Sequence, residues 1–257
     1  MSEAMSLRRR AMAGEPVHGA MVFECTVPGV GRMMANAGAA FAMFDMEHTG
    51  LGYETFKMLV ATCQGLPIAP MVRVPRGEYT YLARALDMGA HGVMVPMVES
   101  VAEARAIAEA TRYPPRGRRG AAFGFAHDGY TGGDVAAKIA GLDERNLVVA
   151  QIETERGLHA VEDIAAVDGI DVLWVGHFDL TNFLGMPGAF DDRRFDTALK
   201  HVAAVARRHG KGAGFMASDA AWMKRAIAAG YNVIAVGPDQ AILTAGYRAI
   251  LGSGARS

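Results

Sequence analysis

Asp45, Glu47 and His48 stand within four positions at the end of the apolar segment FAMFDM. An aspartate three residues before a histidine can orient the imidazole so that it acts as a general base. The alternative is a histidine satisfied by its local surroundings, because an Asp-x-x-His pair alone is a weak signal. The segment predicts proton transfer at His48, with Asp45 as the orienting residue and Glu47 in an outer, structural role.

Two further acids, Glu153 and Asp179, follow apolar segments much later in the chain. Side chains alternate along VVAQIE, so Gln151 and Glu153 share one face, and an ionised carboxylate on a buried face needs a cationic partner. Arg73 is one candidate partner and a metal ion is the other. Two carboxylates together with water or substrate oxygens suit Mg²⁺, Mn²⁺ or Co²⁺. Alternatively, both acids only cap the helices that follow them.

Short β-rich segments alternate with longer stretches of helical periodicity along the chain. We predict eight strands, at residues 17–23, 41–46, 69–74, 92–96, 147–152, 170–175, 211–215 and 233–236. Nearly continuous apolar strands separated by helices are typical of a parallel sheet covered on both faces, and eight such units in this length fit a TIM barrel. We therefore expect an α/β fold, a (β/α)8 TIM barrel forming a single domain over residues 1–257, with an open doubly wound sheet as the alternative.

Catalytic groups of a TIM barrel lie at the carboxyl ends of its strands. The polar residues named above end or follow predicted strands, so this fold would place them on one face.

Helix boundaries can also be predicted at several positions. Ser100 and Glu103 form a capping box that begins a helix, and Gly210 ends another. The long interval at residues 111–146 is expected to form an extended loop with a short helix over one end of the barrel.

The composition favours a protein that acts on small molecules. The 257 residues are 51% hydrophobic and have a net charge of -1 with interspersed charges, which argues against a nucleic-acid or anionic-membrane partner. Cys25 and Cys63 form no CxxC pair, which indicates a reducing compartment, and no run of 18 apolar residues occurs. We expect a cytoplasmic protein without a membrane segment.

Seven motifs follow one another between residues 44 and 218, within a region of similarity that covers roughly residues 17 to 240, namely FDMEH, VRVPRG, ALDMGAHGVMVPMVES, TRYPPRGRRG, QIET, VGHFDLTNFLG and GKGAGFMAS. In this order they resemble the class II pyruvate aldolases of the HpcH/HpaI family. The resemblance implies a metal-dependent enzyme that reversibly cleaves 4-hydroxy-2-oxo acids to pyruvate or hydroxypyruvate and an aldehyde. Its partners would thus be a small 2-oxo acid and an aldehyde.

The resemblance also assigns roles to the polar residues. The glutamate of the QxE motif and the aspartate of the FDLT motif would bind the divalent metal, which implies Glu153 and Asp179. Asp45 and His48 would be the base dyad. Arg73 would be the electrophilic arginine that contacts the substrate's 2-oxo group.

Further positions follow from the same resemblance. Gln151 is expected beside the metal, Gly176 in the loop that holds the pyruvate carboxylate, and Met216 against the substrate. Asp87, in the LDMGA motif, is expected to reach a neighbouring subunit's active site in a homohexamer built as a trimer of dimers.

Two regions depart from the family pattern. His177 stands where the family often has proline, and the segment AAFGFAHDGY differs from the usual sequence after RG. We expect His177 to contact the substrate at the acceptor entrance, with His127 and Asp128 as indirect acceptor contacts. A loop folded back on itself by local hydrogen bonds is the alternative for the second region.

Other functions have weaker support in the sequence. A Schiff-base aldolase needs a lysine in its site, whereas Lys57, Lys138, Lys200 and Lys224 lie on helical patterns and Lys211 opens its strand at the opposite end. A carbon–carbon lyase acting on a coenzyme A ester, of the citrate lyase β-like type, is the alternative enzyme. A non-catalytic barrel is the alternative outside catalysis, and the complete set of site residues argues against it.

Overall fold

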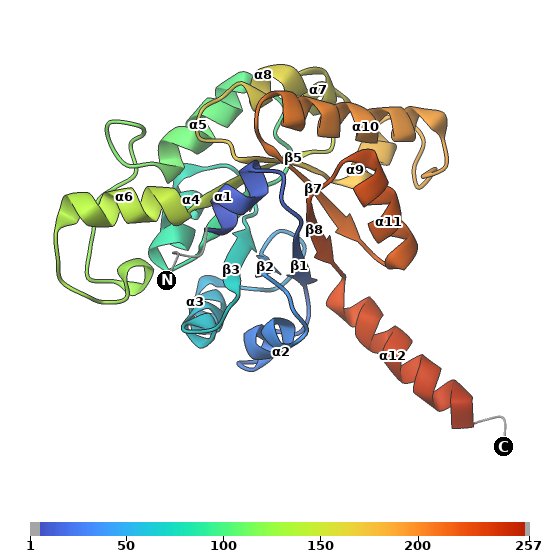
Figure 1. The fold of residues 1–257 in the computed structure, drawn as a ribbon, viewed down its shortest axis with the longest axis horizontal. Coiled ribbons are helices and arrows are strands. Elements are labelled where there is room, and N and C mark those ends of the chain that lie inside the picture. The colour runs from blue at the N-terminus through green and yellow to red at the C-terminus, as the bar shows by residue number, and fades with distance from the viewer. Residues whose placement is uncertain (1–5, 255–257) are drawn as a thin grey trace.

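Eight parallel strands close into a barrel in the computed structural model, which describes residues 6–254 (Figure 1). The strands are β1 (Val17–Val22), β2 (Phe41–Asp45), β3 (Ala69–Arg73), β4 (Gly92–Val95), β5 (Leu147–Ile152), β6 (Val172–Val175), β7 (Gly212–Ala217) and β8 (Val233–Val236). Each strand pairs with its neighbour in sequence, and β8 pairs with β1, where Val233 lies opposite Val17. The predicted TIM barrel is confirmed, and the open doubly wound sheet was wrong.

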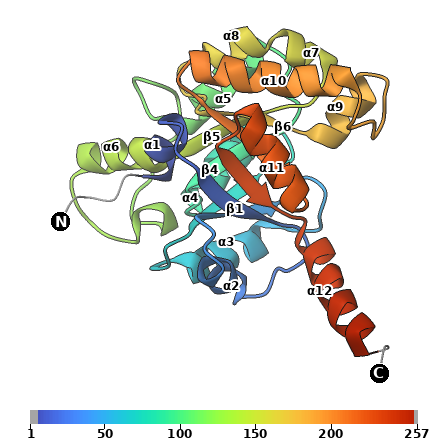
Figure 2. The same cartoon turned by 45° about the vertical axis from the view of Figure 1, so that its right-hand side comes forward.

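Helices follow the strands, and most of them pack around the outer side of the barrel (Figure 2). They are α1 (Leu7–Met12), α2 (Val30–Asn36), α3 (Tyr53–Cys63), α4 (Tyr79–Asp87), α5 (Val101–Thr111), the short 3₁₀ helix η1 (Ala126–Asp128), α6 (Val135–Arg145), α7 (Glu155–His159), α8 (Val161–Ala165), α9 (His177–Phe183), α10 (Arg193–Arg208), α11 (Ala220–Ala229) and α12 (Asp239–Gly254). The predicted cap at Ser100 is present, since its hydroxyl accepts a hydrogen bond from the Glu103 N–H.

Strand boundaries differ from the predicted ones by up to two residues. The sixth strand begins at Val172 rather than at residue 170, because the turn at Gly169, with φ of 101°, precedes it. The seventh strand continues to Ala217 instead of ending at residue 215. The extension matters because it places Met216 within a strand rather than in a loop.

Alternation along β2 decides which of its residues reach the barrel interior. Phe41 and Met43 belong to the interior cluster, whereas Ala42 and Phe44 pack in the outer cluster beneath the helices. Side chains of a strand point alternately to opposite faces. Asp45, the next residue in the inward series, therefore points into the barrel at the carboxyl end of β2.

Other strands repeat this arrangement. The interior cluster contains Met71, Val149 and Trp174, and the residues two positions later are Arg73, Gln151 and Gly176. Tight packing fills the space below them: a Cβ at Gly214 would lie only 2.2 Å from the Trp174 ring. An apolar barrel interior thus ends in polar side chains on one face.

Residues 112–146 pack against the amino-terminal end of the barrel, where Arg112 is the central contact. The Arg112 side chain, 1% exposed, donates hydrogen bonds to the Asp143 and Asn146 carbonyls and pairs with the buried carboxylate of Asp171 at 2.7 Å. Arg8 of α1 contacts the other oxygen of Asp171 at 2.9 Å. The expected extended loop with a short helix is present, and this network ties it to the barrel.

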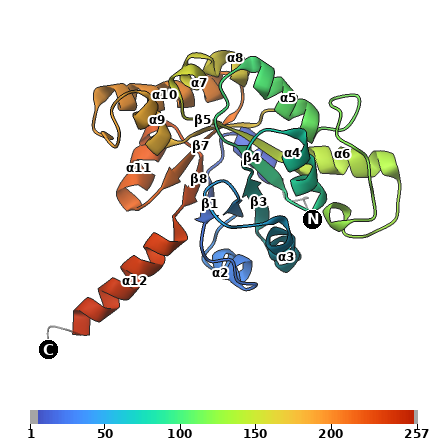
Figure 3. The same cartoon turned by 180° about the vertical axis from the view of Figure 1, so that it is seen from behind.

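The last helix, α12, projects away from the barrel and lies on the opposite side from α6 (Figures 1 and 3). Within residues 6–254, no helix is both long and apolar enough to cross a bilayer.

Arg112→Met should lower the free energy of unfolding by about 3 kcal/mol, because Asp171 then loses one of its two cationic partners inside the protein. Urea denaturation followed by circular dichroism measures the loss. The matched control is Arg105→Met on the exposed surface of α5, which should change stability by less than about 0.5 kcal/mol. Equal stability of the two variants would contradict a structural role for the Arg112 network.

Candidate active site

A cavity of about 350 Å³ lies at the carboxyl ends of the strands. Eight of the residues expected at the site line it, namely His48, Arg73, Gln151, Glu153, Gly176, His177, Asp179 and Met216. These residues follow or end five different strands, which the closed barrel brings together. Asp45 lies behind the lining and Asp87 lies elsewhere.

Arg73 and Asp45 form a buried ion pair at the base of the cavity. They are opposite residues in the pairing of β2 with β3, and the Arg73 Nε donates to Asp45 Oδ1 at 2.6 Å. The Arg73 Nη1 lies 3.1 Å from Glu47 Oε2. In the described part of the chain no hydrogen bond engages Nη2, so this nitrogen can donate to a ligand.

His48 contacts a different carboxylate from the one expected. Asp45 accepts hydrogen bonds from the backbone N–H groups of Glu47 and His48, at 3.2 and 3.0 Å, rather than from the imidazole. The His48 Nε2 lies 3.6 Å from Glu47 Oε2. The expected dyad of Asp45 with the His48 ring is therefore absent from this structure, because the turn after β2 wraps around the aspartate. Glu47 lies between Arg73 and His48 instead.

Glu153 is held by two donors on neighbouring segments. The Met97 N–H donates to Glu153 Oε1 at 2.8 Å, and the Gln151 amide donates to Oε2. Met97 has φ of 55°, a conformation that a non-glycine residue adopts at a cost in strain. Glu153 does not cap the helix that follows, since the Thr154 hydroxyl takes that role. The capping alternative is thus wrong for Glu153.

Negative charge is concentrated around the cavity. Burial raises the pKa of Glu153 to about 7; the hydrogen bonds from Gln151 and Met97 oppose this rise, and Glu47 and Asp179 add to it. Burial likewise raises the pKa of Glu47 to about 7, against the attraction of Arg73. A bound cation would relieve this repulsion.

The donor set fits a divalent cation. Glu153 and Asp179 supply two carboxylates to the cavity, and the buried Glu47 Oε2 lies nearby in its ion pair with Arg73. No cluster of three or more His, Cys, Asp or Glu ligands occurs in the described structure. A metal held here would have two protein carboxylates, with its other positions left to water or substrate oxygens.

The lack of a side chain at Gly176 leaves room for the Glu153 carboxylate. A Cβ at position 176 would lie 2.1 Å from Glu153 Oε2 and 2.9 Å from Glu153 Cβ. Its φ of -86° is open to any residue, so close packing, not backbone conformation, requires glycine here.

His177 lies in an aromatic enclosure that no local sequence pattern predicts. Its ring centroid is 4.6 to 5.5 Å from the rings of Phe178, Phe190, Phe215 and Trp222. Burial lowers the pKa of His177 to about 4. At neutral pH the imidazole is therefore an uncharged group beside the cavity.

Three expected positions lie away from the cavity. Asp87, at the end of α4, pairs with Arg119 at 2.6 Å, and its carbonyl contacts His127 Nδ1 at 3.3 Å. The Asp128 carboxylate pairs with Lys138 at 2.7 Å and accepts from the Gly124 N–H. Within one chain, the local hydrogen-bonded loop is thus the better description of His127 and Asp128.

The lysines also lie away from the cavity. None of the five lines it, and Lys211 donates to the Val167 carbonyl at 3.3 Å, before the start of β7. The expectation that no Schiff-base lysine enters this site agrees with the structure.

Comparison with known proteins identifies the family. The family described as HpcH/HpaI aldolase/citrate lyase matches residues 26–245. The chain belongs to this family. The predicted membership is confirmed, and with it the prediction of an enzyme that cleaves carbon–carbon bonds.

Relatives of this HpcH/HpaI chain include characterised aldolases. A hydroxypyruvate/pyruvate aldolase of Roseovarius nubinhibens is 33% identical over 84% of each chain. A 5-keto-4-deoxy-D-glucarate aldolase of Shigella dysenteriae is 34% identical over 79% of this chain and 78% of its own length. The crystal structure of an HpcH/HpaI aldolase from Desulfitobacterium hafniense matches with a TM-score of 0.92, at 27% identity and over 99% and 98% of the two chains.

Gly176→Ala should lower the free energy of unfolding by about 2 kcal/mol, because the added methyl group overlaps a glutamate already held by Met97 and Gln151. Thermal and urea unfolding check this. Gly50→Ala is the control, since a Cβ there would meet nothing within 4 Å. If Gly176→Ala were as stable as the control, the close packing around Glu153 would be wrong.

Proposed function

We propose that the chain is a divalent-metal-dependent aldolase that reversibly cleaves 4-hydroxy-2-oxo acids to pyruvate or hydroxypyruvate and an aldehyde. The observation that supports this most is one cavity lined by Glu153 and Asp179 together with Arg73 and His48, and by no lysine. The aldolases named above agree with the reaction class. Which aldehyde is used depends on the entrance around His177.

The donor half of the reaction would use the base of the cavity. Glu153 and Asp179 would hold a Mg²⁺, Mn²⁺ or Co²⁺ ion, which supplies Lewis acidity to a bound 2-oxo acid. Arg73 would donate from Nη2 to the 2-oxo oxygen as negative charge develops there. Its ion pair with Asp45 fixes the guanidinium in that direction. Gly176 would leave space for the donor's carboxylate, with Gln151 and Met216 beside it.

The acceptor half would use His48. In the cleavage direction its imidazole would accept the proton of the 4-hydroxyl as the C3–C4 bond breaks, and would return it in the addition direction. Glu47, 3.6 Å from its Nε2, would orient the ring. The neutral His177 could then donate to or accept from a polar group of the aldehyde.

A lyase acting on a coenzyme A ester is the second candidate, and the family description includes citrate lyases. The 350 Å³ cavity favours small substrates over a coenzyme A thioester. Saturable binding of coenzyme A to the chain would reverse this preference.

The proposed donor chemistry is testable without the aldehyde. Pyruvate with the enzyme and Mg²⁺ in deuterated water should lose its methyl proton NMR signal, because polarising the ketone makes those protons acidic. Chelator should stop the exchange. Glu153→Ala and Asp179→Ala should each abolish it, together with Mg²⁺ binding in calorimetry, and Arg73→Ala should slow it about 100-fold.

Lys211→Ala is the control for this experiment, since Lys211 lies before β7 at the other end of the barrel, and exchange should be unchanged. Exchange that persists in excess chelator, with borohydride trapping pyruvate on a lysine, would show that the enzyme is of the Schiff-base class.

We also propose that the chain forms a homo-oligomer, a hexamer by the family resemblance, in which α12 packs against a second copy. Large apolar side chains on α12 are 47 to 74% exposed, namely Ile242, Leu243, Tyr247, Ile250 and Leu251. Their spacing gives one apolar stripe along the helix, and a projecting helix with such a stripe gains stability when another surface covers it. Asp87, paired with Arg119 and remote from its own chain's cavity, would lie at the boundary with a neighbour's cavity, as the family resemblance implies.

Leu243→Asp combined with Leu251→Asp should reduce the oligomer to smaller species, because charges on the stripe cannot be buried without partners. Light scattering coupled to gel filtration measures the mass. Ala245→Glu, at an exposed position of the same helix outside the stripe, should leave the mass unchanged. A monomeric wild-type chain would rule the assembly out.

A further inference from the structure

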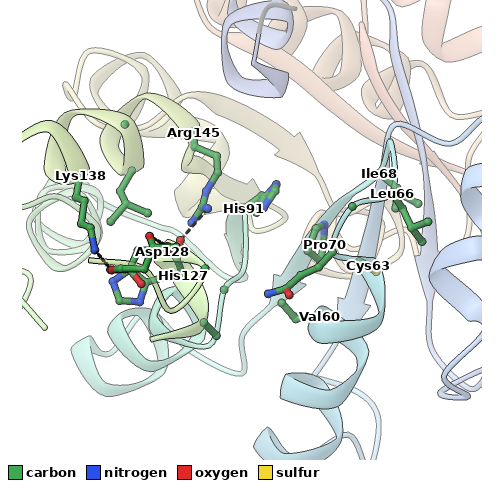
Figure 4. A pocket seen from close by; sticks show the side chains of 18 residues that line it. Val60, Cys63, Leu66, Ile68, Pro70, His91, His127, Asp128, Lys138 and Arg145 are labelled. Carbon is green, nitrogen blue, oxygen red and sulfur yellow. Dashed lines mark hydrogen bonds and ion pairs between the residues drawn. The ribbon is translucent and has the colours of Figure 1, made fainter. Parts of the chain in front are cut away.

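A second cleft, of about 450 Å³, lies near the amino-terminal end of the barrel, away from the active-site cavity (Figure 4). One wall contains Ile68 and Pro70 at the start of β3 and His91 just before β4. The other wall is formed by residues of η1 and α6, including Lys138 and Arg145. None of the residues that line the active-site cavity takes part in it.

Arg145 lines this cleft, and one edge of its guanidinium is buried without hydrogen-bond partners among the described residues. Its Nη1 donates to the His127 carbonyl at 2.9 Å. Its Nε and Nη2 are buried and have no hydrogen-bond partner in the part of the chain described. These two nitrogens share one edge of the guanidinium, and that edge binds a carboxylate through two parallel hydrogen bonds. Because both are shielded from solvent, binding requires the side chain to turn slightly into the cleft.

The charges that face the cleft leave one positive charge in excess. Lys138 and Asp128 neutralise each other at 2.7 Å, and hydrogen bonds from the Gly124 N–H and Lys138 hold the pKa of Asp128 at about 2. Burial lowers the pKa of His91 to about 3, and the neighbouring Arg145 contributes to this shift. Burial likewise lowers the pKa of His127, so both imidazoles are neutral. Arg145 is the remaining charge.

A monoanion balances this charge, whereas a dianion such as hydrogen phosphate would overcompensate it next to Asp128. Apolar walls from Val60, Leu66 and Ile68 suit a short hydrocarbon chain behind the carboxylate. We propose that the cleft is a binding site for small organic monocarboxylates, held by the free edge of Arg145. The site is separate from the catalytic cavity and does not depend on the proposed aldolase reaction.

Gly141 offers a way to close the cleft without removing any hydrogen bond. It lines the cleft on α6, its φ is not positive, and a Cβ there would meet nothing within 4 Å. Gly141→Leu therefore adds a side chain in open space and favours the helix. Ala136→Leu, on the same helix but outside the cleft lining, is the matched control.

Propionate is the probe, added to the full-length protein in excess chelator so that the metal site does not contribute. Saturation-transfer NMR should show saturable binding, weakened at least tenfold by Gly141→Leu and by Arg145→Gln and unchanged by Ala136→Leu. Inorganic phosphate should compete at least tenfold more weakly than acetate. No saturable binding, binding unaffected by Gly141→Leu, or a preference for phosphate would each overturn the proposal.

Discussion

The ion pair between Arg73 and Asp45 is the contact on which the candidate active site depends. The two residues are neighbours across β2 and β3, both in the inward series of their strands, so the register of the barrel brings them together. A buried pair of this kind contributes little net stability, because desolvation offsets the attraction. Its effect is positional: Asp45 also binds the N–H groups of Glu47 and His48 and so fixes the turn that holds both side chains.

Three further carboxylates lie around this pair, and together they carry more negative charge than Arg73 can neutralise. Glu47, Glu153 and Asp179 come from distant parts of the sequence. Burial raises the pKa of both Glu47 and Glu153, Asp179 adds to each rise, and Glu47 adds to the rise at Glu153. A protein keeps buried carboxylates close together only where a cation or a proton compensates them. The same closeness of carboxylates that is costly without a counter-charge therefore suits a divalent ion.

Two arginines at the amino-terminal end of the barrel differ in how many partners they have. At the amino-terminal end, Arg112 has carbonyl and carboxylate partners that fix residues 112–146 to the barrel. Arg145 in the same segment has one partner and two free donors beside an open cleft. Arg112 is paired through both Nη1 and Nη2 and leaves only its Nε without a partner among the described residues, which suits a structural contact. Two unpartnered donors next to a cleft suit a ligand. The distinction depends on side-chain contacts and not on residue type.

The sequence by itself determined the barrel and most of the cavity. Period-two alternation and helix caps are local signals, so the strands, the shared face of Gln151 and Glu153, and the common end of the polar residues could be predicted. Motif order added the family. Only the tertiary structure decided the partners: the ion pair of Glu47 with Arg73, the Met97 N–H on Glu153, the rings of Phe215 and Trp222 beside His177, and the separation of Asp87, His127 and Asp128 from the cavity. These contacts join segments far apart in sequence, and their distances are set by barrel closure and side-chain packing, which leave no local pattern in the chain.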